Sequence, residues 1–261
     1  MKSRSIKILF AVFNLTGFIA TVIINGLANA LPINGKNTGA ISDSLPNLFA
    51  PAGFIFSIWG LIYIMLLAFS IYQLIAVFLK DEKRSEFHNQ ISFYFLIASA
   101  ANCFWILAWH YELFPLSLVL MLILFSSLLM IYLRLGIGGT DHSNLEKYFI
   151  HIPFSIYLGW ITVATIANFT ALFVSIGWKG FGLNPQIWTI AVITVAVLIS
   201  IGMLFMKKDI YFNFVIIWAL TGIAFKRALF NDAHAVYIAA VSGIIILAVL
   251  CTVQYFRKKV Y

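Results

Sequence analysis

The stretch FPLSLVLMLILFSSLLMIYLRL, residues 114–135, decides the fold class of this chain. Its one charged residue is Arg134, and as a helix its 22 residues would extend about 33 Å. That length crosses the hydrocarbon core of a bilayer, which is roughly 30 Å thick. A strand of a membrane barrel would alternate apolar and polar residues, and this run does not. The stretch therefore predicts a membrane-spanning helix.

Runs of the same kind recur along the whole chain of 261 residues. Hydrophobic residues make up 62% of the chain and charged residues 10%, against roughly 45–50% and 25% in soluble domains. A water-soluble fold could not bury that much apolar surface. The sequence predicts an all-α integral membrane protein, a polytopic bundle of about eight transmembrane helices. The expected spans are residues 6–31, 53–79, 91–110, 114–135, 149–177, 185–206, 210–227 and 234–256.

The basic residues predict the orientation, because lysine and arginine tend to stay on the cytoplasmic side. With the N-terminus inside, 13 of the 17 basic residues are cytoplasmic, and Lys36, Lys179, Lys226 and Arg227 lie on the other side. We expect a multi-pass protein of the cell inner (plasma) membrane with both termini in the cytoplasm. The net charge of +8 is spread over loops that flank the membrane, so no nucleic-acid partner is expected.

The first span also has features of a secretory signal peptide, because Ala28-Asn29-Ala30 resembles a small-residue cleavage site. The apolar run from Ile8 to Leu31 is longer than the 7–15 residues usual for a signal peptide. We therefore expect this segment to be a membrane span.

Side chains that carry chemistry are scarce within the predicted spans. All nine acidic residues fall in loops or at span ends, whereas ion pumps and proton-driven transporters usually hold ionisable residues inside the bundle. The five histidines lack metal-ligand spacing, and the two cysteines are typical of small packing residues. No nucleophile with a neighbouring base, P-loop or dinucleotide fingerprint is present. We expect no enzyme activity, no catalytic residue, no metal site and no cofactor.

The polar groups within the spans are mostly amides and indoles. Each buried amide needs a hydrogen-bond partner in a medium without water, so these side chains should face other helices or a cavity. Large flat rings beside amides would suit an apolar pocket for a planar ligand. The alternative is that the tryptophans only pack helices together. The tryptophans well inside their spans are Trp59, Trp105, Trp160 and Trp218.

Three motifs carry a resemblance to a known family. APAGFIFSIWGLIY, residues 50–63, is similar to the second-helix signature of the TspO/MBR family, the tryptophan-rich sensory proteins. Pro51 matches a proline of its PPxW segment, and Trp59-Gly60 with Tyr63 matches its VWxxLY. NCFW at residues 102–105 resembles the third-helix NxxW, and YLGWITVATIAN at residues 157–168 resembles the fifth-helix YLxWxxFATxLN.

The resemblance covers about residues 5–177, and family members usually end after their fifth helix. It implies a five-helix core at residues 1–180 and a three-helix C-terminal extension at residues 181–261, which the resemblance does not explain. The chain departs from the pattern at Gly53, where the family has tryptophan, and at Val163, where it has phenylalanine. Only one proline of the pair is present. These changes would reshape the pocket and leave the ligand open.

The resemblance implies a pocket that binds porphyrins and, in some members, sterols or other apolar compounds. Helical spacing agrees for one face, because Trp160, Ala164, Ala167 and Asn168 follow one another at intervals of 4, 3 and 1 residues. We expect Trp160 and Asn168 to face Trp59 and Asn102. The full set of expected ligand-binding residues is Pro51, Trp59, Tyr63, Asn102, Trp105, Tyr157, Trp160, Ala164, Ala167 and Asn168.

The sequence thus predicts a membrane protein that binds a hydrophobic planar ligand, such as a tetrapyrrole, for sensing, sequestration or translocation. The alternative is a secondary transporter of a neutral or lipid-like small molecule, for which pseudo-symmetric halves would be expected. A third class is an enzyme acting on the bound tetrapyrrole, which no catalytic constellation supports. The expected partners are membrane lipid and a hydrophobic small molecule such as a porphyrin or sterol, and a homodimer is left open.

Overall fold

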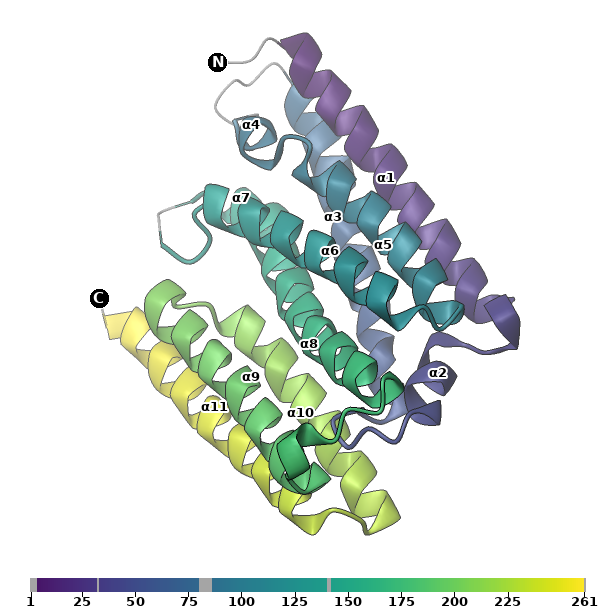
Figure 1. Cartoon of the computed structure of the whole chain (residues 1–261). Helices are drawn as coiled ribbons and strands as arrows, with labels where there is room; N and C mark the ends of the chain where they lie inside the picture. The colour runs from purple at the N-terminus through teal and green to yellow at the C-terminus, as the bar shows by residue number, and fades with distance from the viewer. Residues whose placement is uncertain (1–3, 32, 80–85, 140–141, 261) are drawn as a thin grey trace. The chain divides into compact units, whose positions relative to one another are not determined.

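The computed structural model describes residues 4–31, 33–79, 86–139 and 142–260, and Figure 1 labels its helices. Seven of the described helices are long and apolar enough to cross a membrane, and a shorter apolar helix, Tyr94–His110, joins them. The described part of the chain contains no strand. The chain is a multi-pass, all-α membrane protein, as the sequence predicts.

The long helices follow the predicted spans within a few residues at most ends. They are α1 (Arg4–Ala30), α3 (Ile58–Phe78), α5 (Tyr94–His110), α6 (Phe114–Arg134), α8 (Ile152–Ser175), α9 (Pro185–Lys207), α10 (Ile210–Phe230) and α11 (His234–Val260). The short helices are α2 (Thr38–Ser44), α4 (Phe87–Ile91) and α7 (Asn144–Glu146). Four single-turn segments are η1 (Ile33–Gly35), η2 (Gly53–Ser57), η3 (Lys147–His151) and η4 (Gly180–Gly182). The basic residues Lys2, Lys80, Lys83 and Arg84, used to predict the orientation, lie outside the described residues.

The chain divides into two compact units. The N-terminal unit comprises residues 1–38 and 58–158, and the C-terminal unit comprises residues 39–57 and 159–261. Helix α8 begins in the N-terminal unit and continues into the C-terminal unit. Residues 159–180 thus group with the last three helices, whereas the sequence placed them in the family-like core. The division into residues 1–180 and 181–261 stays a prediction.

In the N-terminal unit, α1 packs against α3 and α5, and α5 packs against α6. Asn14 of α1 donates its amide N–H to Oε1 of Gln73 in α3 at 3.1 Å. The ring Nε2 of His88 lies 3.1 Å from the Gln73 carbonyl oxygen. Buried amides therefore bond across helices, which is what an environment without water requires.

The α5–α6 connection is a three-residue turn that His110 anchors. The His110 side chain is fully buried, with Nδ1 3.1 Å from the Ile33 carbonyl oxygen and Nε2 3.0 Å from Oγ1 of Thr38. Glu112 adopts a positive φ of 56° in the turn and forms an ion pair with Lys36 at 2.6 Å. His110 is thus a structural histidine that fixes the segment after α1.

In the C-terminal unit, α9, α10 and α11 pack against one another in pairs. Ser200 of α9 donates its hydroxyl to Oδ1 of Asn213 in α10 at 2.7 Å. Asp209 caps the start of α10, accepting hydrogen bonds from the backbone N–H groups of Tyr211 and Phe212. The Asp209 carboxylate therefore stabilises the first turn of α10 by accepting hydrogen bonds from its backbone.

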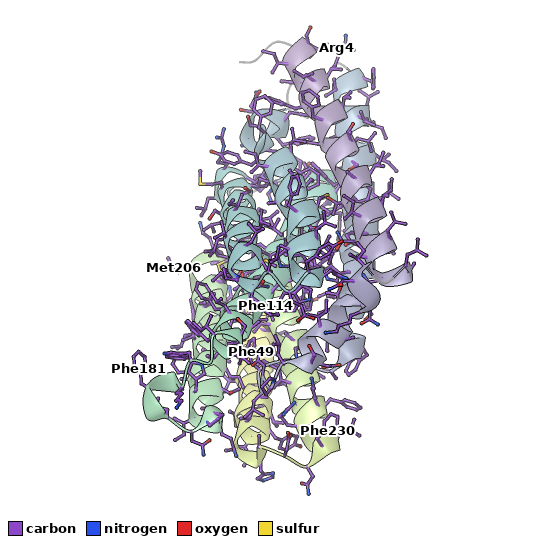
Figure 2. The ribbon with its side chains drawn as sticks, turned by 45° about the vertical axis from the view of Figure 1, so that its right-hand side comes forward. Arg4, Phe49, Phe114, Phe181, Met206 and Phe230 are labelled. Atoms are coloured by element: carbon purple, nitrogen blue, oxygen red, sulfur yellow. The ribbon has the colours of Figure 1, made fainter. Side chains whose placement is uncertain are left out.

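Large apolar side chains project from the helices and their connections, as Figure 2 shows for several labelled residues. Phe181, Met206 and Phe230 are 87%, 82% and 64% exposed. Apolar exposure on this scale would favour association in a soluble protein. On a membrane-spanning bundle, lipid covers such side chains.

Candidate functional site

Rings from three of the sequence motifs meet in the N-terminal unit. The Trp59 ring lies 5.5 Å from that of Tyr63, 6.4 Å from that of Trp105 and 6.1 Å from that of Tyr157, measured between centroids. Trp59 and Tyr63 are one helical turn apart on α3, and their rings are inclined by only 24°. We call Trp59, Tyr63, Trp105 and Tyr157 the aromatic cluster.

A chain of hydrogen bonds supports the aromatic cluster from α1 and α5. Asn25 donates its amide N–H to Oδ1 of Asn102 at 2.7 Å, and Asn102 donates to the Tyr157 hydroxyl at 3.4 Å. Asn102 is fully buried, and Asn25 and Tyr157 are 5% and 2% exposed. Asn102 therefore holds the Tyr157 ring in place, and its partners are protein groups.

The rings of the aromatic cluster differ in accessibility. Trp105 is 4% exposed, whereas Trp59 and Tyr63 are half-buried. The Tyr63 hydroxyl is buried and has no hydrogen-bond partner among the described residues. A buried hydroxyl without a partner costs about 1–3 kcal/mol. The cluster thus combines two near-parallel rings with one unsatisfied polar atom.

In the C-terminal unit, the first half of the residue 50–63 signature is bound to α10. The Ala52 N–H donates to the Gly222 carbonyl oxygen at 3.1 Å, and the Trp218 indole N–H donates to the Ile55 carbonyl oxygen at 3.0 Å. The Phe54 ring packs edge-on against Trp218 with a centroid distance of 5.6 Å. One hydrogen bond and a ring contact therefore join η2 to α10, and a second hydrogen bond joins Ala52, just before η2, to the same helix.

Gly222 allows this close approach. A Cβ atom there would lie 2.0 Å from Cγ1 of Ile55 and 3.0 Å from Cβ of Pro51. Both neighbours are buried, and the proline ring cannot rotate away. Any side chain at residue 222 would therefore push the segment that contains Pro51 and Ile55 off α10.

The remaining predicted site residues lie on α8 in the C-terminal unit. Trp160 is 3% exposed and contacts the Phe56 ring of η2 edge-on at 6.0 Å. Asn168 is also buried and donates its amide N–H to the Ala164 carbonyl oxygen of its own helix at 2.8 Å. Ala164 and Ala167 are half-buried. Pro51, η2 and Trp160 therefore belong to one unit.

The pocket expected from the sequence draws on both units. The N-terminal unit brings together Trp59, Tyr63, Asn102, Trp105 and Tyr157, whose side chains contact one another. The C-terminal unit holds Pro51, Trp160, Ala164, Ala167 and Asn168. Because these two groups of residues belong to different units, the expected facing of Trp160 and Asn168 toward Trp59 and Asn102 stays a prediction.

Comparison with known proteins identifies the family. The sequence model of a family described as TSPO-like protein matches residues 11–253. This chain belongs to the TSPO-like protein family. The match continues through α9 and α10 and most of α11, so the family includes the helices beyond residue 177 that the motif resemblance leaves unexplained. No curated protein and no solved structure matches the chain.

The structure of this TSPO-like protein adds three residues that the sequence motifs do not include, one in the N-terminal unit and two in the C-terminal unit. Asn25 supports Asn102 from α1, and Trp218 and Gly222 hold η2 on α10. The sequence carries a signal for two of them, because Asn25 is an amide within a span and Trp218 is a tryptophan well inside one. Gly222 has no such signal, since a glycine in a membrane helix is common.

Proposed function

We propose that this TSPO-like protein binds a hydrophobic planar ligand through its aromatic cluster, for sensing, sequestration or translocation. A porphyrin or another tetrapyrrole is the expected class of ligand. The observation that carries the proposal is the convergence of Trp59, Trp105 and Tyr157, which come from three separate motifs. Helix packing alone requires apolar side chains, and it does not require aromatic ones at all three places.

The ring geometry supports a planar ligand. The Trp59 and Tyr63 rings are near-parallel and half-buried, so a flat guest can stack against a surface that is already formed. Two hydrogen bonds, from Asn25 to Asn102 and from Asn102 to Tyr157, fix the Tyr157 ring of the aromatic cluster before a ligand binds. This reduces the conformational entropy lost on binding. A preformed aromatic surface of this kind favours a rigid macrocycle over a flexible chain.

The Tyr63 hydroxyl supports a ligand with a hydrogen-bond acceptor. It lies beside the Trp59 ring and lacks a partner among the described residues. The carboxylate or ring nitrogen of a tetrapyrrole would satisfy it, whereas a hydrocarbon such as a carotene would not. Tyr63→Phe should therefore weaken binding of an acceptor-bearing ligand and leave binding of a hydrocarbon unchanged.

A binding screen of the purified full chain in detergent tests the proposal. Porphyrin, haem, sterol and carotenoid would each be titrated against the intrinsic tryptophan fluorescence. We expect saturable quenching by porphyrin or haem, and its loss in Trp59→Ala. Trp188→Ala should retain it, because Trp188 lies in the first turns of α9, packs against Trp178 and is not part of the aromatic cluster. If no compound gives saturable quenching, or if both variants lose it equally, the aromatic cluster is not a ligand site.

We also propose that the protein does not transform its ligand and that it resides in the inner membrane with both termini cytoplasmic. No nucleophile with a neighbouring base lies in the aromatic cluster, where Asn102 and Tyr157 hydrogen-bond to each other. Mass spectrometry should recover a bound porphyrin unchanged after prolonged incubation in light and in darkness. Reporter fusions after residues 84 and 261 should both report the cytoplasm, and an external C-terminus would contradict the predicted orientation.

Transport of a neutral or lipid-like molecule is the second candidate, and one observation favours it. Each compact unit contains four of the long helices when α8 is counted with the C-terminal unit. Transporters are often built from two such halves. Uptake of a neutral sterol into proteoliposomes against an empty-vesicle control distinguishes transport from binding alone.

A further inference from the structure

A groove on the N-terminal unit lies away from the aromatic cluster, between α5 and α6. These two helices lie side by side along their lengths (Figure 1). The groove has a volume of about 400 Å³, within the usual range for small-molecule sites of roughly 300–1,000 Å³. None of the predicted ligand-binding residues lines it. Its lining is formed by Tyr94, Ile97, Val119, Leu122, Ile123, Ser126, Ser127 and Met130.

Small side chains on α6 create the groove. Ser126 is exposed and Ser127 is buried, and Ser127 donates its hydroxyl to the Ile123 carbonyl oxygen of its own helix at 2.8 Å. The Ser127 hydroxyl is therefore satisfied within α6. The walls are otherwise apolar, and Ile97 and Val119 are 44% and 54% exposed. A polar guest would gain little from such walls, whereas a hydrocarbon chain would fit them.

The length of the groove matches one leaflet of a bilayer. On α6 it runs from Val119 to Met130, which corresponds to about 16 Å of helix. Half of a hydrocarbon core is roughly 15 Å. An acyl chain that enters at the Met130 end would therefore pass the middle of α6 at Leu124 and reach about 8 Å beyond it, at Val119.

A fixed positive charge stands at the entrance of the groove. Arg134 lies one helical turn beyond Met130, and its guanidinium carbon is 5.5 Å from the centroid of the Tyr94 ring. Its Nη2 donates to the Asn89 carbonyl oxygen at 2.9 Å. Within residues 4–31, 33–79, 86–139 and 142–260, no carboxylate forms an ion pair with Arg134. The remaining guanidinium donors can bind a phosphate, for which their planar geometry is well suited.

We propose that the α5–α6 groove binds one anionic phospholipid, with an acyl chain along Ser126 and the phosphate at Arg134. The positive charge at the entrance favours a ligand with an anionic group, which an apolar helix lacks. The apolar walls, as long as one leaflet, favour an acyl chain, which a free anion lacks. The site is independent of the planar-ligand function, because it uses other residues.

Native mass spectrometry of the purified full chain tests the site. The protein would be incubated with an equimolar mixture of phosphatidylglycerol and phosphatidylcholine that carry the same acyl chains. We expect one phosphatidylglycerol to be retained about fivefold more than phosphatidylcholine, which is the preference that one basic residue near a membrane surface confers. Arg134→Gln should abolish the preference, and Arg134→Lys should retain most of it.

Two variants, each with a matched control, distinguish lipid binding in the groove from non-specific lipid binding. Ser126→Phe should fill the groove and reduce retention of both lipids, whereas Thr194→Phe, an exposed hydroxyl residue of α9, should not. Arg257→Gln, an exposed arginine near the end of α11, should leave the preference intact. Equal retention of both lipids, an equal effect of Arg257→Gln, or no effect of Ser126→Phe would overturn the proposal. A dimer that Ser126→Phe dissociates, with no lipid retained, would assign the groove to a second copy of the chain.

Discussion

The two compact units support the halves of the residue 50–63 signature in different ways. In the N-terminal unit, Trp59 and Tyr63 belong to a long helix, and amide hydrogen bonds fix the rings around them. In the C-terminal unit, Ile55 belongs to the single-turn segment η2, which begins two residues after Pro51. This part of the chain is joined to α10 by hydrogen bonds to backbone carbonyl groups. One half is therefore held by side chains within a helical bundle, and the other by close backbone contact.

This difference shows why the C-terminal helices matter to a family signature near the N-terminus. The regular segment that follows Pro51, η2, has only five residues and is too short to be stable alone. Gly222 and Trp218 of α10 supply its partners. The helices after residue 180 therefore contribute to the geometry of a motif that the sequence assigns to the core alone.

The largest effect should come from Gly222→Ala. The new Cβ would lie 2.0 Å from Cγ1 of Ile55, so the signature segment must move off α10 and lose its hydrogen bonds. We expect a loss of about 3 kcal/mol in the free energy of unfolding, measured by thermal or denaturant unfolding in detergent. Gly202→Ala is the control, because a Cβ there meets nothing within 4 Å, and it should be neutral or slightly stabilising. Equal effects of the two substitutions would show that η2 does not rest on α10.

The second largest loss in the free energy of unfolding is expected from Asn102→Ala, in the N-terminal unit. This change removes the partner of both Asn25 and Tyr157 and leaves a small cavity, which should cost about 2 kcal/mol. Asn29→Ala is the matched control, since the Asn29 amide donates to the Asn25 carbonyl oxygen of its own helix. Unfolding of both variants in detergent measures the difference. A loss in Asn29→Ala as large as in Asn102→Ala would mean that the hydrogen-bond chain is not what stabilises the cluster.

A smaller effect is expected from Trp218→Phe. The substitution keeps a ring beside Phe54 and removes the N–H that donates to the Ile55 carbonyl oxygen, at a cost of about 1 kcal/mol. Trp188→Phe, with its ring against Trp178, is the control for the change in ring size. The apparent melting temperature should fall more for Trp218→Phe than for Trp188→Phe. The reverse order would place the main support of η2 elsewhere.

The smallest effects on the free energy of unfolding should come from substitutions in two ion pairs, one in each unit. Lys226 pairs with Asp43 in the C-terminal unit, and Lys36 pairs with Glu112 in the N-terminal unit. Lys226 is 14% exposed and Lys36 is 44% exposed, so Lys226→Gln should cost more, although both costs should stay below about 1 kcal/mol. High salt should reduce the difference. A larger cost for Lys36→Gln would show that burial does not set the strength of these pairs.

The sequence predicts the long helices well because the signal is physical and local. Hydrophobic runs must be long enough to span lipid, and breaks such as the turn at Glu112 and Pro115 are polar or conformationally restricted. Local departures are harder to predict: the helix expected from residue 91 begins at Tyr94, because Ser92 adopts a positive φ of 50° and ends α4. Such a turn depends on the packing around it and leaves no pattern in the composition.

The sequence predicts the site residues that a motif marks. It predicts much less about contacts between residues that are far apart in the chain. Trp59, Trp105 and Tyr157 carry the resemblance, and they do meet. The contact of Gly222 with Ile55 joins residues 167 positions apart through a missing side chain. A sequence pattern records which side chains are present, and it does not record which backbone will occupy the space that a glycine leaves.

Binding of a planar ligand by the aromatic cluster can be measured directly on the purified full chain. The dissociation constant of a porphyrin would be determined by fluorescence titration for the parent chain and for Trp59→Ala, Trp160→Ala and Trp188→Ala. We predict that Trp59→Ala weakens binding at least about fivefold, because a stacking ring is lost, while Trp188→Ala leaves the constant unchanged. The effect of Trp160→Ala decides whether the expected site residues of the C-terminal unit take part. Unchanged affinity in Trp59→Ala, with weakened affinity in Trp188→Ala, would contradict the account.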